Sequence, residues 1–65
     1  MTTVHTNWLQ AKAAHRAEML ATYGDTPDLQ YADKRGAEGS ALRAAWLAEV
    51  AADNAYHHQF AAHAA

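Results

Sequence analysis

Alanine is the feature that most restricts how this chain can fold. It accounts for 18 of the 65 residues, and it is the strongest helix former because its side chain loses no entropy when a helix forms. β-Branched residues, which favour strands, are few. The sequence therefore predicts an all-α protein.

The chain is too short to build a deep core. A domain of about 60 residues buries only about 60% of the surface that its unfolded chain exposes. Here the apolar fraction of 51% consists largely of alanine, and only 15 side chains are large and apolar. There is no cysteine, so disulfides and thiolate metal sites cannot stabilise the fold. We therefore expect one helical domain over residues 1–65 that associates with itself or with another protein.

Charge and hydropathy limit the classes of partner. The net charge is −2, with five Lys and Arg residues, so the attraction to nucleic acid is weak and we do not favour a nucleic-acid partner. No apolar run approaches the roughly 18 residues of a membrane span. The first residues carry neither the basic segment nor the apolar stretch of a secretory signal. We expect a cytoplasmic protein with a protein partner and no membrane contact.

Capping residues predict three helices, over residues 7–23, 27–35 and 40–62. Asn7 is a candidate N-cap, with Thr6 as the alternative, and Gly24 supplies a left-handed stop. Thr26 followed by Pro27 is typical of a helix start. Gly36 ends the short second helix, and Ser40 is the expected cap of the third. The alternative is one helix continuous from Pro27 that tolerates two glycines.

These elements predict an antiparallel hairpin of two long helices with a short connecting helix. We expect the hairpin to dimerise into a four-helix bundle. At helical spacing, the apolar stripe of the last helix carries the packing residues Leu42, Trp46 and Phe60, and nearly all of its opposite face is alanine. That face either packs closely against another helix or lies in solvent.

The apolar stripe of each long helix also carries ionisable residues. Arg16 lies in the middle of the first stripe, which includes Trp8, with Lys12 at its margin. Glu49, Asp53 and His57 follow one another at intervals of four residues, so their side chains lie along one face. In an antiparallel hairpin Arg16 comes level with Glu49 and Asp53. We therefore predict a buried ion network that consists of Arg16, Glu49, Asp53 and His57. It should fix the register and the partner more than it adds stability.

A metal site is the alternative for the same residues. Carboxylate and imidazole groups that project from facing helices bind metals in helix bundles, so Glu49, Asp53 and His57 are candidate ligands. Their spacing is not the Glu and His pairing three residues apart of di-metal bundles, and Arg16 would repel a cation. We therefore expect no cofactor. The Asp53–His57 spacing also predicts that any pH-sensitive assembly depends on His57.

The sequence predicts an interaction protein rather than an enzyme. Ser40 is the only serine and is needed as a cap, and no phosphate-binding glycine motif is present. On the short middle helix, Leu29 and Tyr31 are the residues most suited to reach a partner, because aromatic residues dominate interface energetics. We expect a small non-enzymatic adaptor, regulator or inhibitor that acts through a helical surface. A less favoured alternative is a small DNA-binding regulator that uses Lys34, Arg35 and Arg43.

Overall fold

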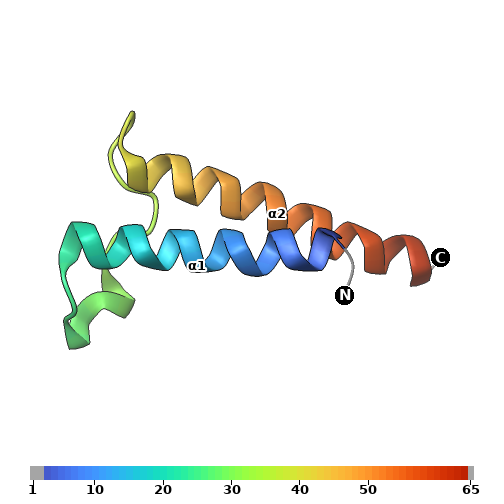
Figure 1. Cartoon of the computed structure of the whole chain (residues 1–65), viewed down its shortest axis with the longest axis horizontal. Coiled ribbons are helices and arrows are strands. Elements are labelled where there is room, and N and C mark those ends of the chain that lie inside the picture. The colour runs from blue at the N-terminus through green and yellow to red at the C-terminus, as the bar shows by residue number, and fades with distance from the viewer. Residues whose placement is uncertain (1–2, 65) are drawn as a thin grey trace.

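A computed structural model shows a hairpin of two long helices (Figure 1). It describes residues 3–64, with side chains for residues 3–59. The elements are α1 (Thr3–Tyr23), a short 3-10 helix η1 (Pro27–Tyr31) and α2 (Ala41–Ala64), and the described residues contain no strand. Helices α1 and α2 pack against each other and are antiparallel, since both chain ends lie at the same end of the hairpin (Figure 1).

The end of α1 and the start of α2 are where the capping residues predict them. Gly24 has a φ of 85° and its amide donates to the Leu20 carbonyl at 2.9 Å, which closes α1 with a left-handed residue. The Ser40 hydroxyl accepts the Arg43 amide at 3.1 Å, which satisfies one free amide of the first turn of α2. The predicted stop and the predicted cap are confirmed.

The start of α1 and the length of the middle helix differ from the prediction. Helix α1 begins at Thr3 rather than Asn7, because nothing in Thr3 to Asn7 prevents helical backbone and so neither Thr6 nor Asn7 serves as a cap. Thr26 and Pro27 do begin η1, with the Thr26 hydroxyl accepting the Asp28 amide at 3.3 Å. The element ends at Tyr31, not Arg35, because Ala32 is extended and the Asp33 carboxylate accepts the Arg35 amide at 3.0 Å.

The buried apolar core of the described residues is very small. It consists of Met19 on α1 and Leu42 on α2, with exposed fractions of 5% and 2%. Both lie at the loop end of the hairpin, where η1 packs on α1. No helix of the described residues is long and apolar enough to cross a membrane. Elsewhere along the hairpin, polar and aromatic side chains must hold the helices together.

Gly36 and Gly39 provide a matched test of the connection between η1 and α2. Both have positive φ, at 72° and 82°. A Cβ on Gly36 would lie 2.8 Å from the Leu42 Cβ, whereas a Cβ on Gly39 would meet nothing within 4 Å. Gly39→Ala should therefore cost only the backbone strain of about 1–2 kcal/mol. Gly36→Ala should cost about 1–3 kcal/mol more, since it also displaces a core leucine.

Urea unfolding followed by helical circular dichroism measures both free energies. Equal losses of stability for the two variants would contradict the close approach of Gly36 to Leu42.

Candidate functional site

Helix α1 faces α2 with polar side chains. The residues of α1 on the side that faces α2 recur at alternating intervals of three and four residues, as in a coiled coil. They are His5, Trp8, Lys12 and His15 on α1, whose partners on α2 are Glu49, Asp53 and Tyr56. The buried residues Met19 and Leu42 belong to the same set at the loop end. We call this set the polar seam. Apart from the two core residues, every member carries a polar or ionisable group.

Lys12 lies at the centre of the polar seam. Its ammonium is 3.4 Å from Glu49 Oε1 and 3.5 Å from Asp53 Oδ1, and it lies 4.9 Å from the centroid of the Trp8 ring. One cation thus balances two carboxylates of α2 and also contacts an aromatic face. The Lys12 side chain is 40% exposed, so water weakens these attractions and they set the register more than the stability.

Trp8, Asp53 and Tyr56 form the contact at the open end of the hairpin. The Trp8 indole N–H donates to Asp53 Oδ1 at 2.5 Å, and the Trp8 ring stacks on the Tyr56 ring with centroids 4.1 Å apart and planes within 3°. His5 stacks on both rings, at 5.8 and 5.6 Å. The Trp8 hydrogen bond, aided by the Lys12 charge and opposed by partial burial, holds the pKa of Asp53 below its usual value.

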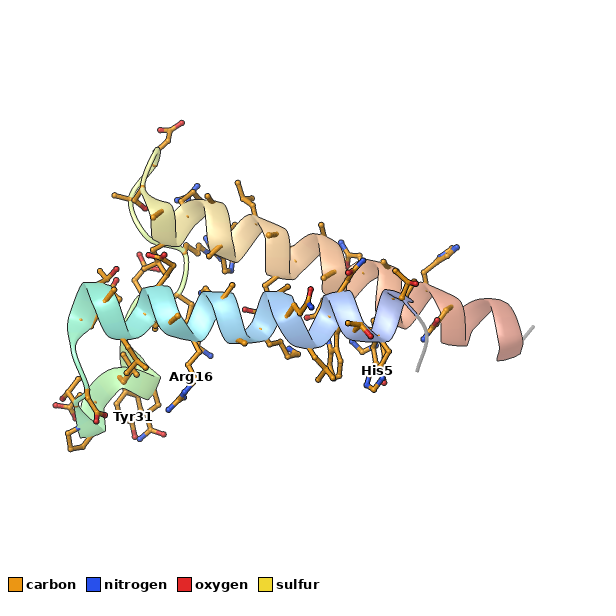
Figure 2. The ribbon with its side chains drawn as sticks, in the orientation of Figure 1. His5, Arg16 and Tyr31 are labelled. Carbon is orange, nitrogen blue, oxygen red and sulfur yellow. The ribbon has the colours of Figure 1, made fainter. Side chains whose placement is uncertain are left out.

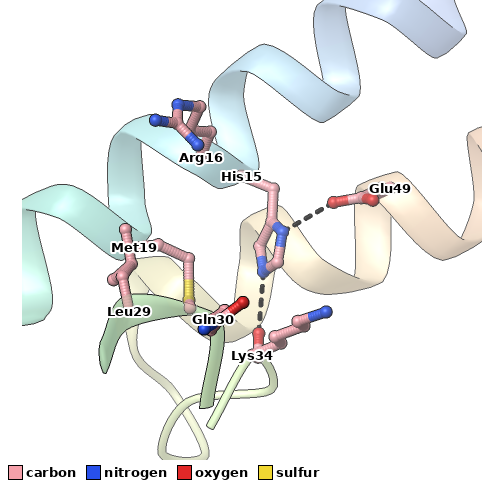
Figure 3. Close-up of a pocket in the computed structure, with 7 residues that line it drawn as sticks. All are labelled: His15, Arg16, Met19, Leu29, Gln30, Lys34 and Glu49. Carbon is pink, nitrogen blue, oxygen red and sulfur yellow. Dashed lines mark hydrogen bonds and ion pairs between the residues drawn. The ribbon is translucent and has the colours of Figure 1, made fainter. Parts of the chain in front are cut away.

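His15 is the buried ionisable residue of the seam. It is 8% exposed. Its ring lies between α2 and the connection that joins η1 to α2. Nδ1 is 2.6 Å from Glu49 Oε2 on α2. Nε2 is 2.8 Å from the backbone carbonyl oxygen of Lys34, in the connection. Figure 3 shows the ring bridging these two acceptors.

Arg16 does not occupy the place that the ion network assigned to it. It is exposed, and in Figure 2 its side chain points away from α2, on the side where η1 lies. Lys12 and His15 take the role instead, since the helix is rotated about its axis relative to the expected stripe. Glu49 and Asp53 are in the network as predicted, but His57 is exposed and touches Tyr56 edge-on with ring centroids 5.7 Å apart.

The candidate metal ligands are not brought together. Among residues 3–59, no group of three or more His, Asp and Glu side chains has the geometry to hold a metal ion. Glu49 and Asp53 face the Lys12 ammonium, and a cation between them would be repelled by it. The carboxylates and His57 therefore do not form the alternative ligand set in this structure.

The predicted packing residues separate into internal and exposed ones. Leu42 is buried, and Trp8 packs in the polar seam. Trp46 lies beneath two guanidinium groups, those of Arg35 at 5.6 Å and Arg43 at 5.7 Å from its ring centroid. Leu29 lines a cavity with Met19. Tyr31 is 80% exposed and projects from η1 (Figure 2), and the Phe60 side chain lies outside the described side chains.

Two of the three basic residues near the glycines, Arg35 and Arg43, have side-chain contacts within the chain. The Arg43 guanidinium donates to the carbonyls of Arg35 and Gly36, each at 3.0 Å. Together with its stacking on Trp46, this ties the connection to the first turn of α2. The Lys34 carbonyl accepts from His15. Arg43 thus helps to fold the connection, whereas the Lys34 and Arg35 side chains are exposed. DNA binding through these residues stays a prediction.

Some large apolar side chains lie on the outer surface of the hairpin. Leu9 is 43% exposed, Leu47 53% and Val50 38%. We call these three residues the outer patch. Leu9 directly follows Trp8, and Val50 directly follows Glu49, so each lies about 100° round its helix from the seam. In antiparallel helices these two positions flank the seam on the same side. Leu47 precedes Val50 by about one turn.

Both the seam and the patch could have been read only in part from the sequence. The alternating spacing of His5, Trp8, Lys12, His15 and Met19 is a coiled-coil repeat, but polar residues occupy three of its five positions. The apolar residues Leu9 and Leu20 point to a different face. Comparisons with models of protein families, with curated proteins and with solved structures gave no match. The functional argument therefore rests on this geometry.

Asp53→Asn tests the electrostatics of the polar seam. Because the folded-state pKa of Asp53 is lowered, its ionised form stabilises the fold above about pH 4, and that contribution is lost as the pH falls further. The amide keeps the shape but not the charge. We therefore expect Asp53→Asn to unfold at lower urea concentration than the wild type at pH 7, and the difference to shrink toward pH 3.

The matched control is Asp25→Asn, at an exposed carboxylate beyond the end of α1. Urea titrations at several pH values should give a wild-type-like profile for this variant. A pH profile of Asp53→Asn that parallels the wild type would refute the assigned role of Asp53.

Proposed function

We propose that this chain is a non-enzymatic interaction module that works as a homodimer, in which two hairpins form a four-helix bundle. The observation that carries the proposal is that polar side chains lie between the two helices while large apolar side chains lie on the outer surface. Lys12, His15, Glu49 and Asp53 lie between the helices, whereas the outer patch lies in solvent. Burying apolar surface is the main favourable term in most protein association. A partner that covers the outer patch supplies the burial that the hairpin itself lacks.

The overall dimensions support the need for a partner. The chain exposes 4720 Å², whereas a compact monomer of its mass exposes about 4,100 Å². Its radius of gyration is 13.4 Å, against about 11 Å for a compact chain of this length. The additional surface, roughly 600 Å², is of the order of the roughly 800 Å² that each partner buries in a standard interface.

The partner that we propose for this surface is a second copy of the chain. A two-fold axis brings the same patch of both copies together, so Leu9 and Val50 of one hairpin would meet those of the other. The connection and η1 cover the same side at the loop end, where Arg16 and Leu29 line a cavity. The uncovered part is therefore the open half of the hairpin. Two antiparallel hairpins that pack in this way make a four-helix bundle.

The exposed alanines offer the second helical surface of the proposed module. Ala44, Ala48, Ala51 and Ala55 of α2 are exposed, so α1 does not cover the alanine face. Such small side chains let another helix approach closely. In the proposed dimer this face stays free to bind a further protein as an adaptor, regulator or inhibitor would. Ser40 is committed to capping α2, and we propose no catalytic role for it.

Val50→Gln and Ala48→Gln form a matched pair that tests the dimer. The two positions flank Glu49 on opposite sides of the seam, both are exposed in the hairpin, and glutamine is a good helix former. Val50→Gln should weaken dimerisation at least about tenfold, because the loss of apolar burial occurs twice in a symmetric interface. Leu9→Gln should act in the same direction, and Ala48→Gln should have little effect.

Native mass spectrometry over a range of protein concentrations gives subunit number and dissociation constant, with circular dichroism to show that each variant is helical. A wild-type chain that stays monomeric at several hundred micromolar would refute the proposed homodimer. Equal effects of the two substitutions would place the interface elsewhere.

A further inference from the structure

His15 is placed to sense protonation. It is the one histidine among the described residues that is buried, and it contacts all three parts of the fold. The residue belongs to α1, Nδ1 faces Glu49 of α2, and Nε2 faces the Lys34 carbonyl of the connection. Figure 3 shows both contacts on opposite edges of the same ring. A change at this ring therefore acts on how the segments are held together.

The two contacts require two hydrogens. A backbone carbonyl can only accept a hydrogen bond, so Nε2 must carry a hydrogen to bind the Lys34 oxygen at 2.8 Å. A neutral imidazole has a single N–H, which leaves a lone pair on Nδ1. That lone pair would then face Glu49 Oε2 at 2.6 Å. Only a further proton between Nδ1 and Oε2 makes this contact attractive.

Glu49 Oε2 increases the need for that proton. This oxygen is buried and has no well-aligned hydrogen-bond donor among the described residues, although His15 Nδ1 lies 2.6 Å from it as an ion pair. A buried carboxylate oxygen without a donor is costly. The positive charge of a protonated His15 is the nearest compensation, since the Lys12 ammonium is on the other oxygen, Oε1, at 3.4 Å.

The other groups described around the ring do not supply the positive charge that His15 can place beside Glu49 Oε2. On α1, Arg16 follows it in sequence and is exposed. On α2, Asp53 lies one turn beyond Glu49 and is held by Trp8 and Lys12. In the connection and η1, Lys34 is exposed and Gln30 is neutral; both line the adjoining cavity of about 210 Å³. The charge balance at Oε2 thus depends on His15.

We propose that His15 is a pH-sensitive latch between the helices and the connection. When the ring is protonated, it holds both Glu49 and the Lys34 carbonyl. When the ring is neutral, it can donate to only one of these two partners, so it no longer ties the Lys34 connection to Glu49 of α2. The latch is internal to one hairpin and does not depend on the proposed dimer.

The direction of the pH effect follows from which form fits the fold. Only the protonated ring donates to both partners, so the stabilisation is present while the ring carries its second proton and is lost when the ring releases it. His57, which the sequence suggested as the pH-sensitive residue, is exposed and has no comparable pair of contacts. We therefore assign the device to His15.

Nuclear magnetic resonance of the wild-type chain tests the latch without any substitution. At pH 6 the ring ¹⁵N shifts of His15 should show both nitrogens protonated. As the pH is raised, the backbone amides of Lys34, Arg35 and Gly36 should shift with the same midpoint as the ring. A neutral ring in the folded protein at pH 6, or a titration that leaves these amides unchanged, would overturn the proposal.

Unfolding measurements provide a second test. Between pH 5.5 and 8.0 the unfolding equilibrium constant of the wild type should rise about tenfold, because the close ion pair between His15 and Glu49 is lost. His58→Gln, at an exposed histidine of α2, should keep this rise, whereas His15→Gln should abolish it. A rise of wild-type size in His15→Gln would overturn the latch.

Glu49→Gln keeps the test valid if His15→Gln does not fold. The amide of glutamine can donate to a neutral ring, so this variant should fold and show a clearly smaller rise with pH. A full-sized rise in Glu49→Gln would contradict the role of the Nδ1–Oε2 contact. Measuring at a concentration too low for dimers keeps this outcome separate from that of the proposed homodimer.

Discussion

The contact of Lys12 and His15 with Glu49 and Asp53 is the interaction on which the rest of the hairpin depends. It fixes which side of α1 meets α2, and it sets the register, since Lys12 reaches both carboxylates and His15 reaches one. Trp8 can donate to Asp53 and stack on Tyr56 only in this register. Charges between helices add little net stability, but a wrong pairing leaves them unsatisfied. The seam therefore acts mainly through specificity.

Placing polar groups between the helices has a consequence for the outside of the molecule. Residues that would fill an ordinary seam, such as Leu9 and Val50, lie partly in solvent, and the buried core is reduced to Met19 and Leu42 at the loop end. Small domains with so little core usually need association or another cross-link. The proposed homodimer and the polar seam are thus two aspects of one arrangement. One sets the fold of a hairpin, and the other completes its burial.

The sequence predicted what depends on near neighbours. The Gly24 stop, the Thr26–Pro27 start and the Ser40 cap involve residues no more than four positions apart, so the pattern alone is sufficient. The predicted register of α1 against α2 differs by one residue, since the α1 residue beside Glu49 is His15 rather than Arg16. The rotation of α1 could not be read, because it depends on contacts between distant residues, and the apolar side chains of α1 are spread over more than one face. His15 was missed for this reason.

The side of α1 that faces α2 is the central claim, and cross-helix nuclear Overhauser effects test it directly. In an isotope-diluted sample, which excludes signals between copies, the structure predicts strong effects between the Trp8 indole and the Tyr56 ring, whose centroids are 4.1 Å apart. If instead the Leu9 methyl groups showed the intramolecular effects to Tyr56 and the Trp8 ring showed none, the polar seam would be contradicted. The helices would then pack through the apolar stripe.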